Sequence, residues 1–238
     1  MLVCHRHRFI FVKTAKTAGS SVELFLRQFC DADDIVTGLN ERDETIAASL
    51  GIGPPRNHGR RPMWPWEIRR RDMHRALRRR SWPRHRPYYH HQSAGEIRTR
   101  LGDDMWNEYR TITIVRDPWD TTVSRYYWQQ RDGRRRKPVP LDAIVQQAGK
   151  NWEIYSVDDE VAVDTVLRFE SLADDLSVLL ADLDLIPRYP LPRAKTGIRP
   201  PRTPAHTILT IDQARQVANA AHREIETFGY RWQGQEPL

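Results

Sequence analysis

The sequence predicts an α/β fold: a single domain with a central, mostly parallel sheet flanked by helices. Short apolar runs alternate with longer stretches of helical pattern along most of the chain. Two of these runs, FIFV and TITIV, end in turns that open a helix. With 238 residues, 39% of them hydrophobic, the chain is long enough for one α/β domain with a real core and short for two. Such alternation implies a mostly parallel sheet that is covered on both faces.

The N-terminal part supplies the first elements of this pattern. The apolar run from Phe9 to Val12 predicts a strand, and the small residues that follow it predict a turn into a helix. DIVTG is short and β-branched, which predicts a second strand. The predicted elements are a strand at residues 8–13, a helix at 20–29, a short strand at 34–38 and a helix at 41–50.

A basic insertion follows, near residues 51–90. Glycine and proline make residues 51–62 a loop. Residues 66–80 fit a helix that is nearly saturated with arginine, and the segment up to residue 92 looks irregular. This stretch could attract an acidic substrate, bind nucleic acid, or be a solvated helix without a ligand.

The second half of the chain carries clearer helix starts. Ser93 and Glu96 have the spacing of a capping box, so a helix is expected to begin at Ala94. Asp117 can cap the helix that follows TITIVR, and Pro118 suits its first turn. The predicted elements are a strand at 111–116, helices at 118–130 and 141–148, a strand at 165–169, a helix to about 184, a proline-rich connection at 187–204 and a helix at 211–228.

Composition excludes several classes of protein. The net charge of +7 favours an anionic ligand, substrate or surface. The two cysteines, Cys4 and Cys30, form no CxxC motif, and the sequence has no Cys/His spacing suited to zinc, so neither a disulfide framework nor a metal site is expected. No apolar stretch reaches the length of about 20 residues that a membrane span needs. With no signal-peptide pattern either, the expected location is the cytoplasm.

The first candidate site is the turn KTAKTAGSSVE, residues 13–23. The free N–H groups and partial positive charge of a helix start bind phosphate-like anions, and small residues let the anion approach the backbone. Lys13 and Lys16 add charge. The Walker A pattern is absent because Gly19 is the turn's only glycine and both lysines precede it. A metal-dependent phosphoryl transferase is therefore disfavoured but not excluded.

A second strand-to-helix turn lies in IVRDPWDTTVSRYYW, residues 114–128. Arg116 ends the strand, and Ser124 lies about two turns along the next helix. Such an arginine and hydroxyl can hold a second, separate phosphate. The competing reading is a local ion pair of Arg116 with Asp117 and a small residue at 124 packed against the sheet.

Together these segments resemble sulfotransferases that use 3′-phosphoadenosine-5′-phosphosulfate (PAPS). KTAKTAGSSVE resembles their 5′-phosphosulfate loop, and IVRDPWDTTVSRYYW their 3′-phosphate segment. HHQSAGEIRTRLG looks like the family's "KHxTAxEIRxxLG", and VLRFESLADDL and IETFGYRW also look like family segments, in the same order along most of the chain. The carbohydrate-type (Golgi-like) branch and its bacterial members are closest in character.

The resemblance implies a P-loop-nucleotide-hydrolase-like sulfotransferase fold, with PAPS as co-substrate and no metal. It places the phosphosulfate loop on Lys16, Thr17, Ala18, Gly19, Ser20 and Ser21, and the 3′-phosphate on Arg116 and Ser124. Two departures matter. The family often has proline where this chain has Ala15, and its "LPxxNxS/T" stretch reads LPRAKTGIR here, which makes Lys195 a nucleotide-closing candidate.

The expected activity is transfer of a sulfuryl group from PAPS to a hydroxyl acceptor. Lys16 would stabilise charge on the leaving phosphate, and Lys13 is a second, weaker candidate for contact with the sulfuryl group. His91, matching the family's catalytic histidine, would accept the acceptor's proton, with the adjacent His90 as competitor.

The acceptor itself stays open. It could be a glycan or a glycosylated metabolite, and an anionic one would suit the basic stretch, but lipids, phenols and peptides are not excluded. The alternatives to a sulfotransferase are a nucleotide-dependent phosphotransferase and a basic nucleic-acid-binding protein, of which nucleic-acid binding is the less expected.

Overall fold

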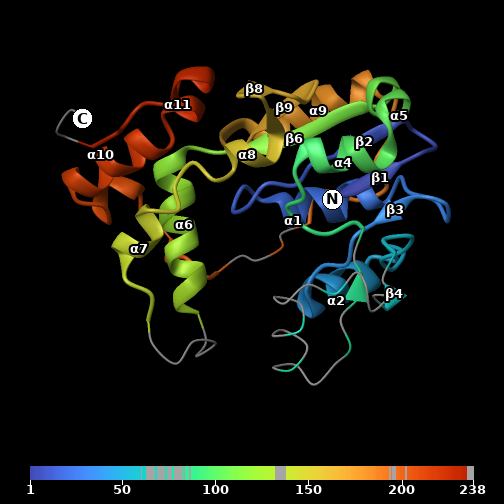
Figure 1. Ribbon diagram of the computed structural model, residues 1–238, viewed down its shortest axis with the longest axis horizontal. Helices are drawn as coiled ribbons and strands as arrows, with labels where there is room; N and C mark the ends of the chain where they lie inside the picture. Colours follow the sequence, from blue (N-terminus) through green and yellow to red (C-terminus); the bar gives the residue numbers. More distant parts are fainter. Residues whose placement is uncertain are drawn as a thin grey trace.

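A computed structural model describes residues 1–59, 61–62, 68, 73, 77, 82, 84–85, 87–131, 138–192, 194, 197–201 and 203–234. It is an α/β structure around a five-stranded sheet of order β3-β1-β2-β6-β9 (Figure 1). The strands are β1 Leu2–Cys4, β2 Phe9–Phe11, β3 Ile35–Val36, β6 Arg110–Val115 and β9 Thr165–Arg168. Within the described residues, no helix combines the length and the apolar composition that a bilayer span requires.

The sheet is mixed rather than mostly parallel, which corrects the expectation from sequence. β6 pairs in parallel with β2 and β9, whereas β1 pairs antiparallel with both β2 and β3. The sequence predicts one N-terminal strand at residues 8–13, but the structure adds β1 before it. The connection from β1 to β2 is only residues 5–8, and so short a connection permits a hairpin but not a parallel crossover.

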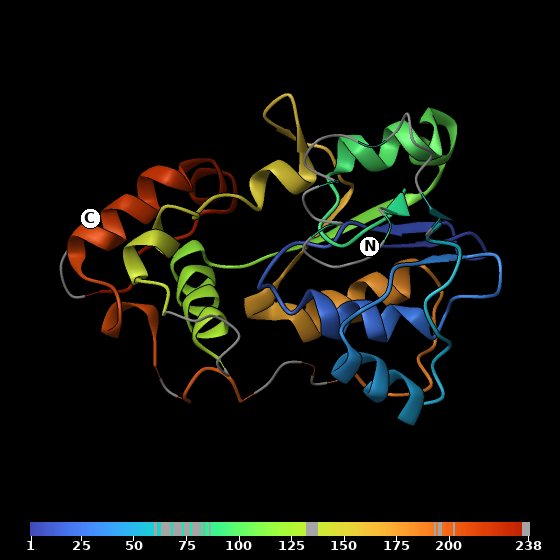
Figure 2. The same cartoon turned by 60° about the horizontal axis from the view of Figure 1, so that its bottom comes forward.

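Helices cover both faces of the sheet, as the sequence predicts (Figure 2). Alternate strand residues, such as Phe9 and Ile112, pack against α1 Gly19–Arg27 and α9 Leu172–Asp182. Ile10 and Val12 face the other way, toward α4, α5 and α8. The bounds on that side are α4 Ala94–Leu101, α5 Asp103–Glu108 and α8 Trp152–Tyr155.

A separate helical group lies beside the sheet, to the left in Figure 1. It comprises α6 Pro118–Gln130, α7 Leu141–Val145, α10 Ile211–Ala220 and α11 His222–Phe228. Trp119 is buried at its centre, and its indole N–H donates to the Ala214 carbonyl oxygen at 2.9 Å. Because α6 directly follows β6, this packing fixes the turn at Arg116.

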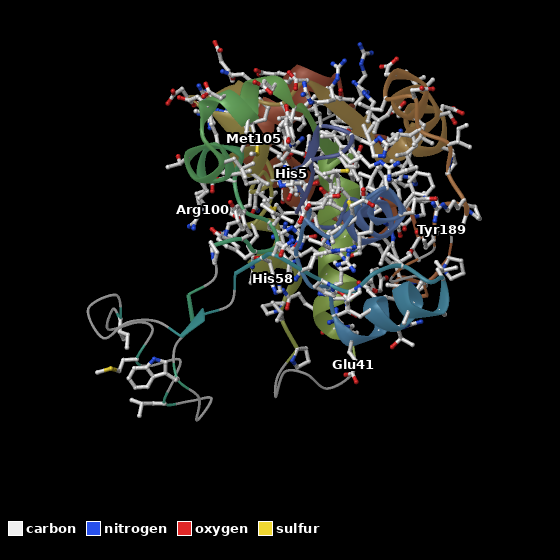
Figure 3. All side chains as sticks on the ribbon, turned by 90° about the vertical axis from the view of Figure 1, so that its right-hand side faces the viewer. His5, Glu41, His58, Arg100, Met105 and Tyr189 are labelled. Atoms are coloured by element: carbon white, nitrogen blue, oxygen red, sulfur yellow. The ribbon has the colours of Figure 1, made fainter. Side chains whose placement is uncertain are left out.

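Helix α2 Glu41–Ser49 packs on α1 through Ala47 and Leu24. Side chains fill the spaces between these layers, and Glu41 lies at the outer end of α2 (Figure 3). The remaining short elements are β4 Arg61–Pro62, β5 Arg84–His85, β7 Ser156–Val157, β8 Glu160–Val161, η2 Phe169–Ser171 and η3 Ala205–Thr207.

Helix starts follow the sequence closely. The side chains of Ser93 and Asp117 accept hydrogen bonds from the backbone N–H groups of Glu96 and Asp120, as predicted. Most of the arginine-rich helix predicted at residues 66–80 lies outside the described residues.

The last helix differs from its prediction at residues 211–228, because it breaks at Ala221 into α10 and α11. Gly149 packs its backbone against this point, where a Cβ atom would lie 2.2 Å from the Ala220 carbonyl oxygen. Residues 211–228 contain no glycine or proline, so the break accompanies a tertiary contact and not a local helix breaker.

Candidate functional site

Three parallel strands bring their carboxyl ends to one edge of the sheet. The residues just beyond them, Lys13 after β2, Arg116 after β6 and Phe169 after β9, line one cavity of about 870 Å³. Most of the candidate residues meet there. The predicted site residues on its wall are Lys13, Lys16, Ala18, Gly19, Ser20, Ser21, His91, Arg116 and Ser124.

Thr17 is the one predicted site residue among the described residues that is not on this wall. Thr17 is fully buried, and its hydroxyl lies 2.7 Å from that of Thr14, which in turn donates to the Ile114 carbonyl oxygen of β6. Its side chain therefore ties the loop to the sheet. Lys195 lies outside the described residues.

The β2–α1 loop has the backbone of an anion-binding turn. Lys16 and Ala18 both have positive φ angles, 69° and 64°, and such alternation can turn successive N–H groups toward one side. Ala18 is the N-cap of α1 and offers no side-chain acceptor to the first turn. Gly19 keeps the loop close to Lys13, because a Cβ atom there would lie 3.0 Å from the Lys13 Cγ. The backbone donors at this helix start are suited to an external anion.

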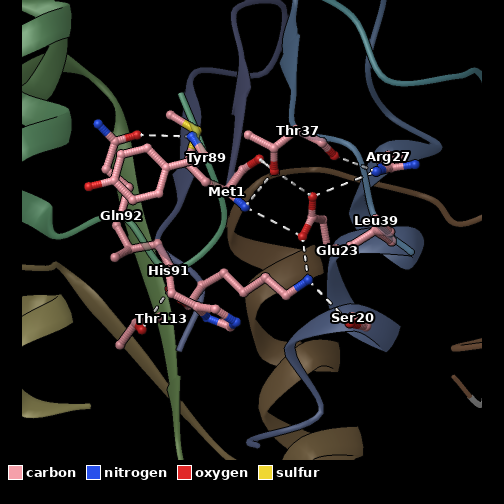
Figure 4. Close-up of polar contacts among 12 residues, drawn as sticks. Met1, Ser20, Glu23, Arg27, Thr37, Leu39, Tyr89, His91, Gln92 and Thr113 are labelled. Atoms are coloured by element: carbon pink, nitrogen blue, oxygen red, sulfur yellow. Dashed lines mark hydrogen bonds and ion pairs between the residues drawn. The ribbon is translucent and has the colours of Figure 1, made fainter. Parts of the chain in front are cut away.

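A buried network of hydrogen bonds and ion pairs around Glu23 lies beside the loop (Figure 4). Lys13 Nζ donates to Glu23 at 2.8 Å and to the Ser20 hydroxyl at 3.2 Å. Glu23 is fully buried and also lies 3.4 Å from the Met1 amino group and 3.7 Å from Arg27. Burial alone would raise the pKa of Glu23, but the charge of Lys13, with smaller contributions from the other two groups, outweighs it and holds that pKa below its usual range. Glu23 therefore offsets much of the Lys13 charge.

Arg116 joins the two candidate turns directly. Its Nη1 donates to the Lys16 carbonyl oxygen at 3.0 Å, and its guanidinium lies 3.7 Å from the centre of the Phe169 ring. Its Nε donates to Asp120 at 2.7 Å. Arg199 Nη1 donates to the other oxygen of Asp120 at 2.5 Å, so one carboxylate orients two arginines on the cavity wall.

Sequence reasoning missed Arg199 and chose Lys195 in the same stretch. The proline-rich connection at 187–204 contains four arginines, and no local signal singles out Arg199 among them. Arg125 was also missed, although it lines the cavity one residue after Ser124.

His91 lies on the cavity wall beside Lys13. Its Nδ1 is 3.0 Å from the Lys13 carbonyl oxygen, which can only accept, so Nδ1 carries the proton of the neutral ring and Nε2 keeps its lone pair. Enclosure by the surrounding protein, and after it the charge of Lys13, lowers the pKa of His91 to about 4, although the ring stays open to the cavity. The ring is therefore neutral near pH 7.

A second cavity, of about 840 Å³, adjoins the first. The two share Lys13, His91, Trp128, Gly197 and Ile198 on their walls. His90 lines only the second cavity, whereas His91 lines both. Of the two histidines, His91 is thus the one at the junction.

Asn151 anchors the β2–α1 loop from a distant part of the chain. Its side-chain oxygen accepts from the Ala15 N–H at 2.9 Å, and its amide donates to the Ala15 carbonyl oxygen at 2.9 Å. Proline at position 15 would have no N–H for the first of these bonds. The sulfotransferases named above often have proline at this position. In this chain two hydrogen bonds from the Asn151 side chain hold Ala15 in place instead, as a clamp.

The clamp leads to a prediction. Asn151→Ala leaves two backbone groups of Ala15 without these partners, and we expect it to lower the free energy of unfolding by about 1–3 kcal/mol. Asn219→Ala, on the exposed face of α10, is the matched control and should change it by less than about 0.5 kcal/mol. Urea unfolding of both variants measures the difference. Equal effects of the two substitutions would contradict the clamp.

The two cysteines meet outside the cavities. Cys4 Sγ, Cys30 Sγ and an Asp34 carboxylate oxygen lie within 4.8 Å of one another, which their sequence separation did not predict. Both oxygens of Asp34 already accept backbone N–H groups, from His5 and Asp31, at 2.6 Å each. A hydrogen bond with Cys4, followed by burial, raises the pKa of Cys30 and opposes thiolate formation. This donor set is thus poorly suited to a metal ion.

Comparison of the chain with protein-family models, with curated proteins and with solved structures gives no match.

Proposed function

We propose that this protein is a sulfotransferase that moves a sulfuryl group from PAPS to a hydroxyl acceptor. The observation that carries the proposal is the junction of two cavities. One is lined by the Gly19 turn and Arg116, the other adjoins it at Lys13, His91 and Trp128. A donor in the first cavity and an acceptor in the second would meet at His91.

The charge on the wall of the first cavity suits a doubly phosphorylated nucleotide. The N–H groups at the start of α1 suit its 5′ end, with Ser20 and Ser21 on the same wall. Arg116 and Ser124 lie on the wall formed by α6 and suit its 3′-phosphate. The hydrogen bond from Arg116 to the Lys16 carbonyl oxygen joins the wall proposed for the 5′ end to the wall proposed for the 3′-phosphate, and so limits the spacing between them.

The transfer step uses groups already in place. The acceptor oxygen forms a bond to sulfur as the bond from sulfur to the 5′-phosphate oxygen breaks. His91 Nε2 takes the proton of the acceptor hydroxyl and passes it to solvent. Lys16 and the backbone N–H groups at the start of α1 stabilise the charge that develops on the leaving phosphate. Positioning and electrostatics do most of the work, as in phosphoryl transfer.

Lys16 provides the test. Its ammonium lies 4.3 Å from the centre of the Trp128 ring, and the residue lines the first cavity. Lys16→Met keeps an apolar stem against that ring and removes the charge. We expect transfer from PAPS to fall by about 10²- to 10³-fold, the usual cost of losing one transition-state donor. Lys150→Met, at an exposed position, is the control.

Ligand binding tests the proposal independently of any acceptor. The product 3′-phosphoadenosine 5′-phosphate (PAP), at 100 times its Kd, should stabilise the folded protein by about 2.7 kcal/mol. Stabilisation by ATP only with magnesium, and none by PAP, would instead favour a nucleotide-dependent phosphotransferase. Salt-sensitive binding of DNA or RNA, with no response to either nucleotide, would favour a nucleic-acid-binding protein.

A further inference from the structure

The wall of the second cavity is basic. Among the residues that the structure describes, the charged ones on this wall are Lys13, Arg42, Asp43 and Arg131. Lys13 pairs with Glu23, and the Asp43 side chain is buried and accepts from the Asn40 amide at 2.8 Å. Besides Lys13, which pairs with Glu23, the cationic side chains described on this wall are thus Arg42 and Arg131.

The two arginines reach the cavity from different elements. Arg42 is exposed on α2 and forms no ion pair with any residue that the structure describes. Arg131 ends α6, with its guanidinium 3.0 Å from the centre of the Trp128 ring. A guanidinium stacked on an aromatic ring still presents donors in its own plane, which suits a bidentate oxyanion.

Trp128 is poorly placed to stack on a sugar or phenol ring. Its indole already contacts two cations, Arg131 at 3.0 Å and Lys16 at 4.3 Å. At Trp128 the protein thus offers positive charge rather than an open aromatic face. His90 adds no charge near neutral pH, because enclosure by the protein and the Lys13 charge lower its pKa to about 3.

We propose that the second cavity takes an alcohol that also carries an oxyanion, namely a carboxylate, phosphate or sulfate. This inference rests on the proposed sulfotransferase function. Arg42 and Arg131 hold the oxyanion, and the hydroxyl lies at His91. A volume of about 840 Å³ is within the range of small-molecule sites, so the acceptor is a small molecule or the end unit of a longer one. The products are the sulfate ester, PAP and one proton.

Matched acceptor pairs test the charge requirement. The carboxylate arm compares 4-nitrophenyl β-glucuronide with the β-glucoside, and 4-hydroxyphenylacetate with 4-hydroxyphenylethanol. The phosphate and sulfate arms compare glucose 6-phosphate and glucose 6-sulfate with glucose. We expect kcat/KM for transfer from PAPS to be about 10- to 100-fold higher for the charged member of an accepted pair, because hydrogen bonds to charged groups are strong.

The arginine variants connect this preference to the wall. Arg42→Ala and Arg131→Ala should each reduce the charged-over-neutral ratio by about tenfold while the affinity for PAP stays unchanged. Arg188→Ala, at an exposed position that lines neither cavity, should leave the ratio as it is. Arg42→Glu should reduce the ratio further than Arg42→Ala.

The outcomes separate this inference from the function on which it rests. If PAP neither binds nor stabilises the protein, the sulfotransferase function fails and this inference fails with it. If PAP binds but neutral acceptors are used as well as charged ones, or no charged compound is used, only the present inference is overturned. An unchanged ratio in both arginine variants also overturns it.

Discussion

Replacing His91 with asparagine is expected to lower the rate of sulfuryl transfer by about 10²- to 10⁴-fold, the usual contribution of a positioned general base. Asparagine tolerates the left-handed backbone at this position, where φ is 55°. Its amide can still donate to the Lys13 carbonyl oxygen, as Nδ1 does now. It offers no nitrogen lone pair to take the acceptor's proton. Initial rates from PAPS, with PAP affinity measured by calorimetry, give the result.

The pH profile of the wild-type protein supports or contradicts the same role. A base works in its unprotonated form, and burial with the Lys13 charge lowers the pKa of His91 to about 4. The acidic limb of kcat/KM, which reports the free protein, should therefore lie near pH 4 and not near the ordinary histidine value of about 6.5. Activity should stay level as the pH falls from 7 to 5.

Two further histidine variants serve as comparisons. His206→Asn changes an exposed ring in η3 and should leave transfer unchanged. His90→Asn should cost less than His91→Asn, because His90 lines only the second cavity. A larger loss from His90→Asn would move the role of base to that residue.

Arg116→Ala is expected to weaken PAP binding by about 10- to 100-fold, because it removes charge-assisted hydrogen bonds to the 3′-phosphate. Adenosine 5′-phosphate lacks that phosphate and is the comparison ligand. If Arg116 holds the 3′-phosphate, its loss should weaken PAP binding and leave the binding of adenosine 5′-phosphate nearly unchanged. Calorimetric titration of both ligands into wild-type and variant protein measures the two effects.

The comparison ligand also detects a purely structural effect. Arg116 donates to the Lys16 carbonyl oxygen at 3.0 Å, so its loss could loosen the whole loop. Loosening would weaken both ligands equally and would contradict the assignment. Arg98→Ala is the matched protein control, because Arg98 also pairs with an aspartate, Asp103 at 2.6 Å, but at the surface.

Much of the local structure could be predicted from short stretches of sequence. The Ser93 and Asp117 caps depend on a side chain and a backbone N–H three residues away. The apolar run from Phe9 to Val12 alternates between two faces, and so predicts a strand covered on both sides. The extra strand β1 was missed, because LVC before a run of charged residues gives no clear strand signal.

The candidate site divides in the same way. The sequence determined the two turns, at Gly19 and at Arg116, because a helix start that suits an anion depends on consecutive residues. Only the tertiary structure decided that Asn151 clamps Ala15, that Asp120 orients both Arg116 and Arg199, and that α2 supplies part of the second cavity. These contacts join segments up to 136 residues apart. No local pattern encodes such contacts, because they form only when the packed sheet and helices bring the segments together.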